Sequence, residues 1–105
     1  MNLNYFVTVL RVTEGADDGY GHFPETWNAF CTTWADKHDV SDAELVAAGQ
    51  EYSLTVSRFR VPWDPDTATI TGNDRLEYEG QWNVRRVKEL ERNRWLEITA
   101  EKRSD

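Results

Sequence analysis

The residues with the most reactive side chains in this chain of 105 amino acids are two histidines and one cysteine. His22 and His38 belong to no H-x-x-x-H or H-E-x-x-H pattern, the spacing that directs two imidazoles at one metal ion. Cys31 is the only cysteine, which excludes an intrachain disulfide and a cysteine-based zinc site and suits a reducing cytoplasm. We therefore expect two unrelated surface histidines, and a small core residue at Cys31 rather than a nucleophile.

Paired acids and short glycine motifs give no stronger sign of catalysis. Asp17-Asp18 and Asp64-Pro65-Asp66 lack the alternating ligand spacing of a calcium loop. The sequence contains no G-x-S-x-G turn, no P-loop and no G-x-G-x-x-G motif. The sequence therefore predicts a protein that is not an enzyme and that has no metal site and no cofactor.

The most concentrated feature is a basic cluster near the C-terminus. Its five cations lie within ten residues and are Arg85, Arg86, Lys88, Arg92 and Arg94. Glu89 and Glu91 are interleaved with them, so the local balance is +3. Three interpretations stay open: cross-strand charge pairing, recognition of a complementary protein surface, and contact with nucleic acid.

The charge of the whole chain argues against a protein that wraps nucleic acid. The net charge is −7, and all of the excess lies in residues 1–51, where nine acids face two bases. Residues 52–105 hold ten of each and are neutral. Nucleic-acid binding normally requires a basic stripe that neutralises phosphates. No apolar run is long enough to span a membrane and the N-terminus does not resemble a signal peptide, so we expect a soluble protein without a membrane partner.

The elements that would position these residues are mainly strands. Alternating or β-branched runs predict strands over residues 4–13, 26–37, 52–61, 67–71, 75–79, 81–87 and 94–101. Gly80 allows a tight hairpin, and residues 81–88 and 94–101 are expected to pair around the turn K-E-L-E-R-N. In the last strand Leu96, Ile98 and Ala100 share one face, which we assign to the core.

Two further segments differ from this pattern. Residues 14–25 are rich in glycine and aspartate and predict a long loop. Ser41 and Glu44 have the spacing of a capping box, and Gly49 supplies a stop, which predicts a short helix. Residues 26–37 are partly apolar on both faces, so this strand is expected to be covered by the barrel interior on one side and by a neighbour on the other. Six or seven strands and one short helix in a single domain over residues 1–105 predict an all-β fold, a small antiparallel barrel or sandwich.

The order of these pieces resembles the phage head-closure or head–tail joining proteins, also called head–tail adaptors or stoppers. The resemblance covers roughly residues 4–102. It is carried in order by VTVLRVTEG, PETWN, TWA, ELVAAGQ, LTVSRFR, RLEYEGQWNV and RWLEITAE. It implies a small β-barrel in a homo-oligomeric ring below the portal, which extends the DNA channel and offers a surface to the tail.

The resemblance also implies partners, a location and candidate residues. The partners would be other copies of the chain, portal or adaptor proteins and tail proteins, with DNA passing through without tight binding. The protein would be made in the bacterial cytoplasm and reside in a virion, a prophage-derived particle or a gene-transfer particle. The candidate lumen insert comprises Val40, Ser41, Asp42, Glu44, Leu45, Gln50 and Glu51. The candidate subunit or partner interface comprises Tyr20, His22, Phe23, Arg85, Arg86, Lys88, Arg92 and Arg94.

An alternative from another functional class is a monomeric OB-like β-barrel that binds single-stranded nucleic acid. In that case Trp82 and Trp95 would stack on bases and Arg94 would contact phosphate.

Overall fold

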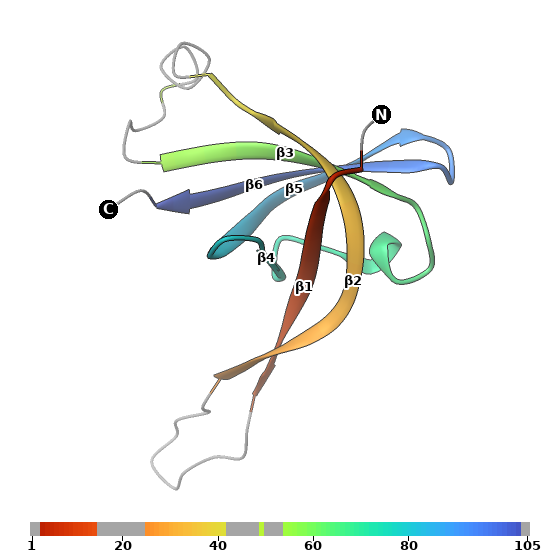
Figure 1. The fold of residues 1–105 in the computed structure, drawn as a ribbon. Helices are drawn as coiled ribbons and strands as arrows, with labels where there is room; N and C mark the ends of the chain where they lie inside the picture. The colour runs from red at the N-terminus through yellow and green to blue at the C-terminus, as the bar shows by residue number, and fades with distance from the viewer. Residues whose placement is uncertain (1–2, 15–24, 42–48, 50–53, 104–105) are drawn as a thin grey trace, which may run out of the picture.

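A computed structural model describes residues 3–14, 25–41, 49 and 54–103 (Figure 1). The described residues form six strands and one short 3-10 helix. Their bounds are β1 Tyr5–Glu14, β2 Glu25–Asp39, β3 Leu54–Pro62, η1 Thr67–Thr69, β4 Arg75–Glu77, β5 Gln81–Glu91 and β6 Trp95–Arg103. The strands close into an antiparallel barrel in the order β1-β2-β3-β6-β5-β4, and β4 pairs with β1 to complete it. The predicted all-β barrel is confirmed.

The barrel interior follows the alternation of the strand sequences. Leu96, Ile98 and Ala100 of β6 are buried in one core cluster, as predicted. Phe59 of β3 meets Trp82 of β5 edge to face, with ring centroids 5.3 Å apart. The indole N–H of Trp82 donates to the carbonyl oxygen of Tyr78 at 2.9 Å, so the ring is buried without an unpaired donor.

Two β-bulges matter for the surface. Val9 faces Cys31 while Leu10 faces Ala29, which makes Phe30 an extra residue in β2. In β5, Val84 faces Ala100 and Arg86 faces Thr99, which makes Arg85 an extra residue. Such bulges bend a strand and change the direction of the side chains that follow.

The prediction of a strand over residues 67–71 is wrong. Thr67–Thr69 forms a 3-10 helix instead. The Asp64 side chain accepts hydrogen bonds from the backbone N–H groups of Asp66 and Thr67, each at 2.8 Å. The Thr67 hydroxyl donates to the carbonyl oxygen of Pro62 at 2.9 Å. These local side-chain bonds stabilise a turn in place of a ladder, and they override the β propensity of the threonines.

The other predicted strands are present with different ends. The hairpins β4–β5 and β5–β6 both form, and Gly80 has a φ of 111° in the first turn. β5 continues to Glu91, beyond the predicted end at Val87, which leaves only residues 92–94 as the second turn. The predicted loop over residues 14–25 and the predicted helix lie almost wholly outside the described residues.

A partly buried ion pair connects β1 to the turn that precedes β4. The Arg11 guanidinium donates to both carboxylate oxygens of Asp74 at 3.1 Å, and Asp74 is only 4% exposed. The same carboxylate accepts the backbone N–H of Thr71 at 3.0 Å. Asp74 raises the pKa of Arg11 by this hydrogen bonding, more than burial lowers it. No helix in the described part of the chain is long and apolar enough to cross a membrane.

Candidate functional site

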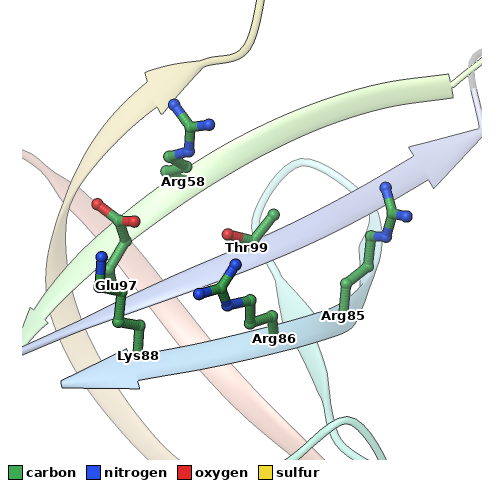
Figure 2. A pocket seen from close by; sticks show the side chains of 6 residues that line it. All are labelled: Arg58, Arg85, Arg86, Lys88, Glu97 and Thr99. Carbon is green, nitrogen blue, oxygen red and sulfur yellow. The ribbon is translucent and has the colours of Figure 1, made fainter. Parts of the chain in front are cut away.

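The candidate site is a surface pocket on the outer face of β3, β6 and β5. Its volume is about 630 Å³, and we call it the basic patch. The residues that line it are Arg58, Arg85, Arg86, Lys88, Glu97 and Thr99. Figure 2 shows that these side chains come from three neighbouring strands. Four cations and one carboxylate give the patch a formal charge of +3.

Strand register arranges the patch in rows across β6. Glu97 lies opposite Arg60 on one side and Lys88 on the other. In the next row Thr99 lies opposite Arg58 and Arg86. The row of Glu97 therefore has a carboxylate between two cations, whereas the row of Thr99 has a neutral hydroxyl there.

The bulge at Arg85 explains why so many cations of β5 face outward. Trp82 and Val84 point into the barrel, and strict alternation would send Arg86 inward as well. The extra residue at Arg85 shifts the alternation by one position. As a result Val87 packs against the core, and Arg86 and Lys88 are exposed.

Two ion pairs between neighbouring strands involve residues of the patch. The Arg60 Nε lies 3.1 Å from the Glu97 carboxylate. The Arg85 guanidinium lies 3.6 Å from Glu101. Cross-strand charge pairing, one of the three interpretations of the basic cluster, is therefore present at Arg85, and the patch keeps an excess of positive charge. Such an arrangement recognises carboxylate or phosphate groups, because guanidinium groups match both in shape and charge.

The predicted basic cluster divides into two parts in the structure. Arg85, Arg86 and Lys88 line the basic patch, whereas Arg92 and Arg94 are exposed at the β5–β6 turn. Arg94 lies 3.3 Å from the Glu91 carboxylate. Sequence reasoning missed Arg58, whose outward position follows from the alternation of β3. Its proximity to Arg86 depends on the β3–β6 pairing, which the sequence did not indicate.

The remaining predicted site residues are mostly not described. Tyr20, His22, Phe23, Asp42, Glu44, Leu45, Gln50 and Glu51 lie outside the described residues. Val40 is half-buried, and its N–H donates to the carbonyl oxygen of Val56 at 2.9 Å. Ser41 is exposed.

The stacking residues proposed for single-stranded nucleic acid are not supported. Trp82 is 2% exposed and packs against Phe59, so its face is closed to a base. Trp95 is half-buried at the start of β6. Because stacking requires an accessible ring face, the proposed role of Trp82 is corrected to that of a core residue.

The residues first considered for chemistry lie apart from the patch. His38 contacts the Asp36 carboxylate at 3.0 Å, and Cys31 is half-buried against the core. Burial raises the pKa of the Cys31 thiol, which lowers the thiolate fraction needed for nucleophilic attack. Among the described residues, no group of three His, Cys, Asp or Glu side chains is placed to hold a metal ion.

Comparisons with known proteins agree on one architecture. A family model described as phage head completion protein matches residues 1–103. A solution structure of a protein from Shigella flexneri 2a has a TM-score of 0.71 and 21% identity, and 95% of each chain is covered. A chain from the virion of a native gene transfer agent particle has a TM-score of 0.68 and 20% identity, covering 98% of this chain and 96% of that one. No curated protein sequence matches the chain significantly.

Proposed function

Since the chain belongs to the phage head completion protein family and is a structural component of the virion, we propose that it forms a homo-oligomeric ring at the head–tail joint. The ring extends the DNA channel below the portal and provides the surface to which the tail attaches. The observation that carries this proposal is the family match over residues 1–103, together with a barrel that agrees in fold with a gene transfer agent virion chain. The role is mechanical, and no catalytic step is assigned to any residue.

The outer surface of the barrel supports a role in assembly. The basic patch includes residues of two cross-strand ion pairs and carries more cations than carboxylates. Arginine is enriched at protein interfaces, and its planar guanidinium loses little freedom for each hydrogen bond that it forms. We therefore assign Arg85, Arg86 and Lys88 to a boundary with another subunit or with the adaptor, and Arg92 and Arg94 to its periphery.

The charge distribution suits a channel through which DNA slides. The surplus of acids lies entirely in residues 1–51, which include the segment 40–51 proposed to face the lumen. Like charge between a lumen and a phosphate backbone limits adhesion within a Debye length of about 8 Å at physiological salt. A lumen of this kind guides DNA without retaining it.

Deletion of the gene tests the proposed function. We expect filled heads and free tails that do not join, and restoration of joined particles by the wild-type gene supplied in trans. Particle morphology by electron microscopy and the yield of functional particles are the two measurements. Normal numbers of joined, functional particles from the deletion would refute the proposal.

A further inference from the structure

β2 has a long free edge. On one side, β1 pairs with residues 25–35 of β2, with Phe30 as the bulge. On the other side, β3 pairs with β2 only through residues 36–39. Among the described residues, no strand therefore lies beside residues 25–35 on that second side. Figure 1 shows β1 and β2 extending away from the rest of the barrel there. A free edge carries unpaired N–H and C=O groups at alternate residues, and another extended chain can pair with them.

The sequence of this edge lacks the features that keep free edges unpaired. Residues 26–35, TWNAFCTTWA, contain no charged residue, no proline and no glycine. Proteins usually protect a free edge with lysine, with proline or by keeping the strand very short. The free edge of β5, beyond its pairing with β4, has that protection, because five of residues 84–91 are charged. The edge of β2 is therefore suited to pairing, whereas the edge of β5 is not.

Exposed apolar side chains gather beside the same edge. In the described part of the chain, the large apolar side chains that are exposed are Phe6, Phe30 and Trp34, at 49%, 37% and 52%. Phe30 and Trp34 lie on the free part of β2, and Phe6 lies opposite Trp34 with ring centroids 5.0 Å apart. Side chains of adjacent strands contact each other on a shared face, so a strand added beside β2 would cover Trp34. Burial of these rings would add to the energy of backbone pairing.

The composition of the edge determines which kind of segment fits it. Unpaired backbone groups need an extended chain, and a neutral edge with exposed rings favours neutral residues with apolar side chains at alternate positions. The other long free edge in the described residues, that of β5, is charged. Two copies of the β2 edge would pair around a twofold axis, whereas a ring joins unlike surfaces. A segment of a different protein therefore fits this edge better than a second copy does.

We propose that an extended segment of another protein at the head–tail joint adds to the barrel as a strand beside residues 25–35 of β2. Such a segment is uncharged over about six residues or more, the usual length of a strand, and its alternate side chains pack on Trp34. Backbone hydrogen bonds would supply affinity, and the side chains would supply specificity. The inference rests on the proposed function, which would bring portal, adaptor and tail proteins to this barrel.

Two threonines that face each other give a matched pair of variants. Thr32 is exposed on the free edge of β2, and Thr8 of β1 lies opposite it. Thr8 has a strand on both sides, because it also pairs with Glu77 of β4. Thr32→Lys places on the free edge the residue that proteins use to prevent edge pairing. Thr8→Lys adds the same charge within the closed part of the sheet.

The yield of joined particles distinguishes the two variants when each complements the gene deletion. We expect Thr32→Lys to lower the yield at least about fivefold and Thr8→Lys to lower it less than about twofold. Circular dichroism of the purified proteins checks that both keep the fold. Normal joining with Thr32→Lys, or equal losses with the two folded variants, would overturn the inference.

Photo-crosslinking in joined particles identifies the segment and also decides the matter if a lysine variant does not fold. Trp34 is replaced by p-benzoylphenylalanine, which keeps an aromatic side chain at an exposed position. We expect irradiation to give an adduct with a portal, adaptor or tail protein. Mass spectrometry should place that adduct in an uncharged segment of about six residues or more.

The other outcomes separate this inference from the proposed function. Adducts only between copies of the chain, adducts within a charged segment, or no adduct at all would overturn the inference. In each of these cases the head–tail role would still stand, because the particles have joined. Loss of that role would instead appear as normal joining in the gene deletion.

Discussion

Asp74 is the residue whose loss the barrel should tolerate least. It is 4% exposed, and its carboxylate binds both the Arg11 guanidinium and the Thr71 N–H. Asp74→Ala leaves the backbone N–H of Thr71 without its acceptor, and it leaves the partly buried Arg11 guanidinium with only its bonds to Thr69. We expect the free energy of unfolding to fall by about 2–4 kcal/mol, measured by urea denaturation.

Asp66→Ala provides the matched control for that change. Asp66 is exposed and precedes the 3-10 helix without a side-chain cap bond. Its removal should change stability by less than about 0.5 kcal/mol. Equal effects of the two substitutions would contradict a structural role for the Arg11–Asp74 pair.

Asp39 should give stability a measurable pH dependence. Hydrogen bonds from Lys37 and then from Ser57 lower the pKa of Asp39 in the folded protein. A lowered pKa means that folding favours the ionised carboxylate. The contribution is therefore complete above the ordinary Asp pKa of about 3.9 and disappears as pH falls through the lower folded value.

The substitution Asp39→Asn isolates this contribution. Because the side chain is 67% exposed, solvent screening limits the expected loss at pH 7 to about 1 kcal/mol. Thermal unfolding of the wild type and the variant should differ at pH 7 and converge as pH falls below about 3.9. A difference that stays constant down to pH 2 would show that the carboxylate charge is not responsible.

Individual residues were predictable from the sequence where alternation decides their side. Leu96, Ile98 and Ala100 follow a strict period of two in β6, so their burial was foreseen. Arg58 follows the same alternation, but its membership of the basic patch depends on its pairing with Thr99, which is 41 residues along the chain. No feature of the sequence indicated that Asp74 would be buried in an ion pair. A single acid between turns is usually solvated, and its partner Arg11 is distant in sequence.

At the scale of elements, the bulge at Arg85 has the largest consequence for the surface. It brings two consecutive arginines to the outer face while Val84 and Val87 both contact the core. Deleting Arg85 removes the extra residue of the bulge. Either Arg86 then points into the barrel, or the preceding segment of β5 shifts its register against β6. We expect the free energy of unfolding to fall by about 3 kcal/mol or more, because a cation or other polar groups would enter the interior without partners.

Arg85→Ala is the control for the deletion, because it removes the same guanidinium and keeps the bulge. Urea denaturation should show a change within about 0.5 kcal/mol for this variant. A deletion variant as stable as Arg85→Ala would mean that the bulge does not determine which side chains face the core.

Elements were predicted well where periodicity persisted and poorly where side chains bond to the local backbone. The strands of both C-terminal hairpins form as expected, although β5 is longer than the alternation suggested because bulges interrupt its period. Thr67–Thr69 has strand-like composition, yet the Asp64 side chain and the Thr67 hydroxyl stabilise a helical turn. Bulges and side-chain turns are both local exceptions that a simple period does not reveal.

At the scale of the whole molecule, the barrel separates two kinds of surface. In the described part of the chain, the closed sheet leaves strand edges where a strand extends beyond its neighbour, as β2 does before Asp36 and β5 does after Asn83. Exposed aromatic side chains lie on β1 and β2, and excess positive charge lies on β3, β6 and β5, of which β3 pairs with β2. A small barrel with two unlike faces gains stability when copies bind each other, since association adds to a modest core.

Charge reversal tests whether the basic patch is needed for assembly. We expect Arg86→Glu combined with Lys88→Glu to leave the monomer folded, because both side chains are exposed. The reversal removes the positive charge that is proposed to face another subunit or the adaptor, so association should weaken. A loss of about 1.4 kcal/mol per contact lowers association tenfold, and a ring multiplies the effect over all its contacts. The measurements are circular dichroism for the fold and the fraction of joined particles when the variant complements the deletion.

The β5–β6 turn offers a second pair of cations at a different distance from the patch. Arg92→Glu combined with Arg94→Glu makes the same charge change at exposed positions, one of which already pairs with Glu91. We expect this pair to impair joining as well, but less than the reversal at Arg86 and Lys88, because the turn lies at the periphery of the contact. Equal or greater impairment of joining would indicate that the centre of the contact lies at the β5–β6 turn rather than on the outer face of β5. Unimpaired joining with both double variants would exclude the basic side of the barrel from assembly altogether.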